Sequence, residues 1–133
     1  MLPVDETFTK PYFIGLIDKL TERIVQDRPK SGTNGMFIHM DNARPHLIPD
    51  KLHQVGLKRI PHPAYSPDLS PSDFFIFGYM KHQLQGHSFG TREELFDAVQ
   101  RILYEIPKET LIAAYTSWIK RLSICISTHG EYI

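Results

Sequence analysis

Four prolines between residues 61 and 71 constrain the fold of this chain more than any other feature of its sequence. They belong to the stretch PHPAYSPDLSPSD at residues 61–73. Proline lacks a backbone N–H and its ring clashes inside a helix, so this spacing excludes a regular helix or a central strand. We therefore predict a stiff loop at residues 62–73. A strand is predicted before it, at residues 57–61, and a helix after it, from Ser72 or Asp73 to about Gly86.

The residues before the loop predict a helix, a strand and a second, shorter helix. Apolar residues at helical spacing follow Thr9, a suitable N-cap, and the pattern stops before Pro29. The short apolar run at residues 36–40 is bounded by turn residues, which is typical of a buried strand. A short helix is expected at residues 49–54, ended by Gly56.

The last third of the chain is predicted to be helical. Thr91 and Glu94 have the spacing of a capping box, so a helix is expected to begin there and to continue to about Ile106. Pro107 marks a break, and a last helix is expected from there towards Gly130. The predicted fold class is α/β, with few strands for a fold of that class.

Composition limits the compartment and the kind of partner. The chain has 133 residues, the size of one domain, and its 15 basic and 15 acidic residues leave no overall positive field to attract nucleic acid. A single cysteine, Cys125, cannot form an internal disulfide, which suits a reducing compartment. No apolar run approaches the roughly 20 residues of a membrane span. We expect a protein of the bacterial cytoplasm or, in a eukaryote, of the nucleus, without a membrane partner.

Two aspartates are the strongest candidates for chemistry. Asp41 directly follows the predicted strand at residues 36–40, and ligands of α/β sheets bind at the carboxyl ends of strands. Asp73 follows 32 residues later, at the start of a helix. Carboxylates are ligands of Mg²⁺, and a pair of such ions can stabilise both oxygens of a phosphoryl displacement. The alternatives are a strand-end turn for Asp41 and an N-cap for Asp73.

Two sequence blocks resemble those of the mariner-type DDE/DDD transposases, a superfamily with bacterial insertion-sequence relatives. Residues 40–46, MDNARPH, are similar to the second catalytic block of that superfamily, and residues 61–75, PHPAYSPDLSPSDFF, are similar to its third. The chain end is similar as well, at residues 118–122, 125–126 and 130–133. The resemblance runs from about residue 8 to the last residue.

The resemblance implies a partial RNase H-like fold over residues 1–133, the C-terminal portion of a transposase catalytic domain. In the family, three acidic residues bind two Mg²⁺ or Mn²⁺ ions and the enzyme cuts and joins DNA strands. Asp41 matches the second of these acidic residues and Asp73 the third, whereas Asp68 matches a position that the family uses structurally.

The resemblance also makes transposon-end DNA the expected partner. Three polar residues of the second block are candidate DNA contacts: Asn42, Arg44 and His46. Their alternative roles are polar contacts at the protein surface. For Asn42, the alternative is an Asx-type bond that fixes the turn after the strand.

The chain departs from the family pattern at two points. The family carries its first catalytic Asp on an early strand, yet residues 8–24 already resemble the helix before the second block. Asp5 and Glu6 lie only 36 and 35 residues before Asp41 and have no strand around them, so we do not expect them to replace the first catalytic Asp. The first strands and the DNA-reading region are therefore expected to be absent. The interval from Asp41 to Asp73 is also about three residues shorter than usual, nearly one helical turn.

Two functions remain open from the sequence. The first is a transposase fragment, inactive alone, that acts with an upstream fragment carrying the first Asp, or as a homodimer. The second is a non-catalytic remnant that binds DNA or protein, or oligomerises through the edge of its incomplete sheet. A decayed product without a role is a third outcome.

Overall fold

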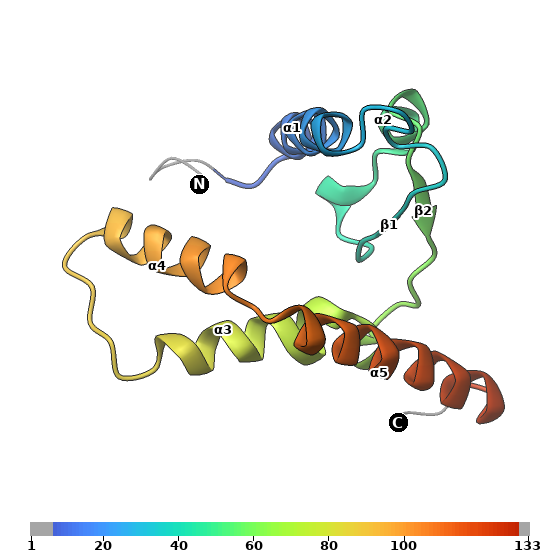
Figure 1. Cartoon of the computed structure of the whole chain (residues 1–133). Coiled ribbons are helices and arrows are strands. Elements are labelled where there is room, and N and C mark those ends of the chain that lie inside the picture. Colours follow the sequence, from blue (N-terminus) through green and yellow to red (C-terminus); the bar gives the residue numbers. More distant parts are fainter. Residues whose placement is uncertain (1–6, 131–133) are drawn as a thin grey trace. The chain divides into compact units, whose positions relative to one another are not determined.

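The computed structural model describes residues 7–130, which form a mixed α/β fold (Figure 1). The chain divides after Ala64 into two compact units. The acidic pair Asp5 and Glu6, and the similarity at residues 131–133, lie outside the described residues. Within residues 7–130, no helix combines the length and the apolar character that crossing a membrane requires.

The first unit contains a pair of short parallel strands with helices between and before them. Its elements are α1 (Lys10–Asp27), β1 (Phe37–His39), the 3₁₀ turn η1 (Arg44–His46), α2 (Pro49–Gln54) and β2 (Lys58–Ile60). The strands pair with Ile38 opposite Arg59. The Tyr12 backbone N–H donates to the Thr9 side chain at 3.4 Å, which confirms the predicted N-cap of α1. Since parallel strands end at the same edge of a sheet, the residues that follow β1 and β2 come close together.

The core of the first unit joins its helices to its strands. Five buried apolar side chains form it: Ile17, Met40, Ile48, Leu52 and Leu57. An ion pair between Asp18 and Lys51 also ties α1 to α2. Gly56 ends α2 as predicted, with a φ of +73°, and a Cβ there would lie 2.9 Å from Thr33 Oγ1. That hydroxyl donates to the Val55 carbonyl, so a side chain at residue 56 would disturb a long-range hydrogen bond.

The expected burial of the strand at residues 36–40 is wrong, although the strand itself is confirmed. Phe37 is 60% exposed, and Ile38 and His39 are half-buried. The reason is the width of the sheet, which has two strands in the described part of the chain. Apolar side chains that a wider, covered sheet would bury are therefore left in contact with solvent.

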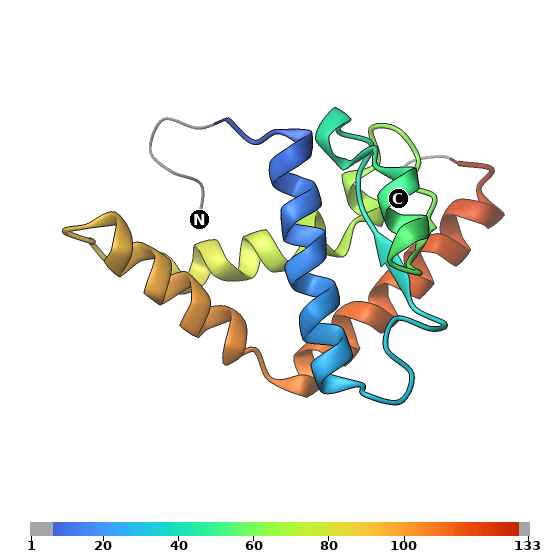
Figure 2. The same cartoon turned by 90° about the horizontal axis from the view of Figure 1, so that it is seen from above.

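The second unit is helical. It consists of the 3₁₀ turn η2 (Pro67–Leu69), the π-helical turn η3 (Ser72–Ile76), and the helices α3 (Phe77–Leu84), α4 (Arg92–Tyr104) and α5 (Lys108–Ser127). Figure 2 shows the chain folding back from α3 into α4 through a short loop. The capping box of α4 is present in a shifted form. Thr91 accepts from the Glu94 N–H, but the Glu94 carboxylate accepts from Gly90, one residue before the N-cap.

The proline-rich segment at residues 61–73 follows the prediction in part. It contains no regular strand or α-helix before Pro71, but Pro67–Leu69 forms a 3₁₀ turn. The last residue of this turn, Leu69, and the residue after it, Ser70, are both buried. The following helix begins at the predicted place, as a π-helical turn that becomes α-helical at Phe77.

Candidate functional site

Asp41 lies two residues beyond β1, and its carboxylate organises the turn that follows. The Ala43 backbone N–H donates to Asp41 Oδ1 at 3.0 Å, which forms an Asx turn. His46 Nδ1 bonds to the same oxygen. The strand-end turn considered for Asp41 is therefore present, and the Asx bond expected of Asn42 is made by Asp41 instead. The Asp41 side chain remains 53% exposed, and neither of these two bonds uses Oδ2.

The surroundings of Asp41 favour its anionic form. Burial raises the pKa of the Asp41 carboxyl, but this is more than offset by the Ala43 N–H, by the hydrogen bond with His46 and by the charges of His46 and His62. The pKa of Asp41 therefore lies below its usual value. The group is an anionic carboxylate with one oxygen held by the protein and one open, which suits a hard cation.

Arg59 of β2 holds the backbone beside Asp41. Its Nη2 atom donates to the Asp41 carbonyl at 2.7 Å and to Asn42 Oδ1 at 2.9 Å. Asn42 Nδ2 donates in turn to the His62 carbonyl at 2.8 Å. The residues that follow the two parallel strands are thus cross-linked by side chains.

Arg59 is not among the site residues predicted from the sequence. The available signal was a charged residue in a short strand, one position before its end, in a sheet whose parallel strands finish at the same edge. Its Nε is buried without a hydrogen-bond partner in the described residues. Buried polar groups without hydrogen-bond partners are rare. The guanidinium is therefore held by its two Nη2 hydrogen bonds, although its Nε makes none within the described part of the chain.

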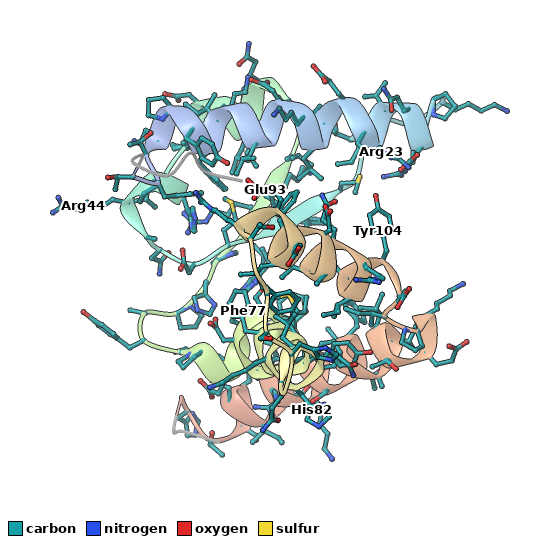
Figure 3. All side chains as sticks on the ribbon, turned by 90° about the vertical axis from the view of Figure 1, so that its left-hand side faces the viewer. Arg23, Arg44, Phe77, His82, Glu93 and Tyr104 are labelled. Atoms are coloured by element: carbon teal, nitrogen blue, oxygen red, sulfur yellow. The ribbon has the colours of Figure 1, made fainter. Side chains whose placement is uncertain are left out.

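The turn η1 carries two of the predicted DNA contacts, Arg44 and His46, and their side chains have different surroundings. The His46 ring packs against Phe13, with centroids 4.5 Å apart, and meets Phe8 edge-on at 5.6 Å. With its Nδ1 engaged by Asp41, His46 is part of the support of that carboxylate. Arg44 is exposed, and its side chain extends away from the ribbon (Figure 3). Of the residues in this turn, Arg44 is the one open to a partner.

A pair of histidines lies beside this network. His39 Nε2 and His62 Nδ1 are 3.1 Å apart, and their rings meet edge to face. The pair does not extend into a larger ligand set: residues 7–130 contain no group of three His, Cys, Asp or Glu side chains placed to hold a metal ion.

Asp73 belongs to the second unit and lies in the first turn of η3. Pro71 occupies the N-cap position and no side chain caps this turn, so the N-cap role considered for Asp73 is wrong. The Asp73 N–H donates to the Ser70 carbonyl at 3.0 Å, and its side chain is exposed. π-Helical turns are frequent at functional sites, because they shift the side chains that follow relative to a regular helix. Asp68, the other acidic residue of the loop, lies in η2 and is half-buried.

Comparison with known proteins identifies relatives of the whole chain. No family model matches it. The chain is 30% identical over 101 residues to the Mariner Mos1 transposase of Drosophila mauritiana, which covers 74% of this chain and 29% of that protein. It is 28% identical over 131 residues to the Histone-lysine N-methyltransferase SETMAR of Homo sapiens, and the match covers 96% of this chain and 19% of that protein.

Solved structures give the same result. The crystal structure of the catalytic domain of Mos1 mariner transposase superposes with a TM-score of 0.86 at 25% identity, over 97% of this chain and 66% of that one. The chain is homologous to the mariner transposases. The Mos1 transposase paired-end complex with left transposon end also matches, with a TM-score of 0.87 at 25% identity, over 98% and 39% of the chains.

The structural match to the Mos1 catalytic domain confirms the RNase H-like fold that the two sequence blocks implied. The chain spans less than a third of the length of the two curated relatives and about two-thirds of the Mos1 catalytic domain. The match therefore concerns this part of a mariner catalytic domain.

The donor chemistry of this chain fits a hard divalent cation. Asp41 presents an anionic oxygen that Ala43 and His46 do not use, and Asp73 presents an exposed carboxylate. Carboxylate oxygens are the ligands that Mg²⁺ and Mn²⁺ prefer. The structure brings Asn42, His46 and Arg59 together around Asp41, whereas Asp73 lies in the other unit.

Proposed function

We propose that this chain provides the second and third metal-binding aspartates, Asp41 and Asp73, of a mariner-type transposase that cleaves and transfers DNA strands. The observation that carries the proposal is the state of Asp41. A carboxylate at the end of a parallel strand is kept anionic, with Oδ1 bound by the protein and Oδ2 open. The position of Asp41 in the MDNARPH block and the homology to the Mos1 catalytic domain support this role.

The proposed cofactor is Mg²⁺ or Mn²⁺, held by the carboxylates of Asp41 and Asp73. A bound pair of such ions would stabilise the charge that develops on the phosphate oxygens when a DNA strand is cut or joined. The choice of metal is supported by structures of the Mos1 catalytic domain with Raltegravir and Mn, and with Raltegravir and Mg. The contribution of this chain is to hold the ligands: Ala43 and His46 orient the Asp41 carboxylate, and Arg59 holds its backbone.

We further propose that Arg44 contacts the DNA. Its exposed guanidinium, in the turn directly after Asp41, suits a phosphate oxygen. Asn42 and His46, the other predicted contacts, have side chains engaged within the protein. For these two, a role in shaping the site is better supported than direct contact with DNA. The proposed DNA is a transposon end, the kind named in the matching Mos1 paired-end complex.

Catalysis in this scheme requires a further aspartate from polypeptide outside residues 7–130. The family resemblance places that residue on a strand before the segment that corresponds to α1. We propose that the residues of this chain form the C-terminal part of the catalytic domain and act only together with that polypeptide, whether it belongs to the same molecule, an upstream fragment or a second copy.

The test combines the chain with a segment carrying the first strands and first aspartate of a mariner catalytic domain. In the presence of Mg²⁺ or Mn²⁺, the mixture is expected to nick DNA bearing the element ends. Asp41→Ala and Asp73→Ala are each expected to abolish nicking, because each removes a metal ligand. Chelation of the metal should have the same effect.

Matched controls are available in both units. Asp50→Ala, at an exposed position of α2, and Asp97→Ala, at an exposed position of α4, are expected to retain nicking. Nicking that persists in Asp41→Ala would overturn the proposed assignment. Nicking that is lost equally in Asp41→Ala and Asp50→Ala would mean that the effect is not specific to the metal ligand.

A second candidate function is a non-catalytic module that associates through its sheet. The observation that favours it is Phe37, an aromatic residue 60% exposed on a strand of a two-stranded sheet. Exposed strands of this kind pair with other chains. Size-exclusion chromatography with light scattering is expected to show oligomers that Phe37→Lys dissociates. A well-folded monomer at high concentration would contradict this candidate.

A further inference from the structure

In the second unit, helix α5 is bonded to the loop that precedes Asp73. Two side chains one helical turn apart on α5 donate to consecutive backbone carbonyls of that loop. Trp118 Nε1 donates to the Leu69 carbonyl at 2.8 Å, and Arg121 Nη1 donates to the Asp68 carbonyl at 3.2 Å. These contacts join residues 49 and 53 positions apart in the sequence. We refer to Trp118 and Arg121 as the α5 clamp.

Packing holds both sides of the α5 clamp in place. Three residues at the contact are buried: Leu69, Ser70 and Trp118. The Arg121 guanidinium lies over the Phe74 ring, 4.3 Å from its centroid, in a cation–π arrangement. Arg121 Nε also donates to Ser117 Oγ at 3.4 Å. The arginine is thus held from its own helix and from the segment that it contacts.

The α5 clamp contacts residues on both sides of Asp73 in the sequence. Directly after the two clamped carbonyls, the Ser70 carbonyl accepts from the N–H groups of Asp73 and Phe74, both at 3.0 Å. These two bonds open the turn η3. On the other side of Asp73, Phe74 lies under the Arg121 guanidinium. The backbone that carries the Asp73 carboxylate is therefore held on both sides, while the carboxylate itself is exposed.

We propose that Trp118 and Arg121 are positioning residues for Asp73. They hold residues 68–70 against α5, so that the first turn of η3 presents the Asp73 carboxylate at a fixed place. The inference rests on the proposed function, in which Asp73 is a metal ligand. Neither residue touches the metal or the DNA in this scheme. Removal of a residue that orients a metal ligand without touching the metal typically lowers metal affinity by about 10- to 100-fold.

The first test measures the turn itself and needs no metal. Amide hydrogen exchange of Asp73 and Phe74 reports the two bonds to the Ser70 carbonyl. Arg121→Gln removes the guanidinium and Trp118→Phe removes the indole N–H, and each is expected to speed exchange of both amides by about five- to tenfold. Arg121→Lys keeps a cation over Phe74 and is expected to restore part of the protection. Lys120→Gln, an exposed change on the same helix, should leave the rates unchanged.

Exchange rates that stay at the wild-type value in both Arg121→Gln and Trp118→Phe would overturn the proposal. A general loss of the fold would instead speed exchange throughout the second unit. Amides in the middle of α4 serve as the internal reference, and they are expected to keep their wild-type rates in Arg121→Gln.

The second test measures metal binding directly. Mn²⁺ is titrated into the full chain, and the broadening of NMR signals around Asp73 gives the midpoint of binding. Arg121→Gln is expected to raise this midpoint about tenfold, with Arg121→Lys closer to the wild type and Lys120→Gln unchanged. The same change in midpoint is not expected from a residue that only stabilises the fold, because the chain remains folded at the temperature of the titration.

The two ways to fail are distinguishable. If Asp73→Asn and the wild type respond alike to Mn²⁺, Asp73 is not a ligand, and the proposed function fails together with the inference drawn from it. If Asp73→Asn abolishes the broadening but Arg121→Gln titrates like the wild type, the proposed function stands and the positioning role is wrong.

Discussion

The two proposed metal ligands of this chain are held by different means. The Asp41 carboxylate is bonded directly, by groups two and five residues further along the chain, and its backbone is bonded by Arg59. Asp73 has no capping bond to its carboxylate, and its backbone depends on contacts from a helix about 50 residues later. A ligand at a strand end can therefore be fixed by its own neighbours, whereas one at the start of a helix after a loop requires a distant element.

The packing around the two aspartates differs in the same way. In the first unit, the core cluster of five buried residues includes Met40, the residue directly before Asp41. In the second unit, the loop before Asp73 is held by the α5 clamp, and Trp118 is the member of the clamp that is buried. Because one large buried side chain supplies both packing and a hydrogen bond, this arrangement should be more sensitive to a single substitution.

The largest expected effect therefore comes from Trp118→Ala. Removal of a buried indole and its hydrogen bond is expected to lower the free energy of unfolding by about 3–5 kcal/mol. Denaturation followed by far-UV circular dichroism measures it, since Trp118 is the only tryptophan and its fluorescence disappears with it. Ile126→Ala, on the same helix and 77% exposed, is expected to stay within about 0.5 kcal/mol of the wild type. Similar losses in both variants would show that α5 as a whole, and not Trp118, anchors the loop.

Arg59 bonds the backbone beside Asp41, as Trp118 bonds the loop before Asp73. Arg59→Met is nevertheless expected to lower the free energy of unfolding by less than Trp118→Ala does. The change removes two hydrogen bonds, but Asp41 and Asn42 are exposed and water replaces part of what is lost. We expect a loss of about 1 kcal/mol in the free energy of unfolding, measured by urea denaturation. Arg44→Met, an exposed change on the neighbouring turn, serves as the control and should be close to neutral. A loss as large as that of Trp118→Ala would contradict the contrast between the two aspartates.

The features that the sequence predicted correctly are those that depend on neighbouring residues. The cap at Thr9, the stop at Gly56 and the start of the helix after Pro71 follow from local backbone chemistry, and the structure contains each of them. The strand-end turn at Asp41 was considered for the same reason. Each of these needs only a few residues of sequence to be recognised.

The features that were not predicted depend on residues far apart in the chain. The exposure of Phe37 follows from the number of strands in the sheet, which its own segment does not encode. The role of Arg59 requires the parallel register of β1 and β2, and the α5 clamp requires the packing of α5 on η2. The roles of Asp41 and Asp73 in metal binding remain predictions that rest on the family resemblance and on the open oxygens of the two carboxylates.

The smallest expected effect is the pH dependence that Asp41 contributes to stability. Because the pKa of the folded-state carboxyl is lowered, its contribution is present above the unfolded-state pKa of about 3.9 and is lost as the pH falls through the lower folded-state value. Asp41→Asn keeps an oxygen for the Ala43 N–H but removes the charge. The stability difference between wild type and Asp41→Asn should therefore shrink as the pH falls below about 4. Urea denaturation across this range measures it. Two curves that run parallel down to pH 3 would show that the bonds to Oδ1 do not hold the anionic form, and would remove the distinction between a carboxylate fixed directly and one fixed through its backbone.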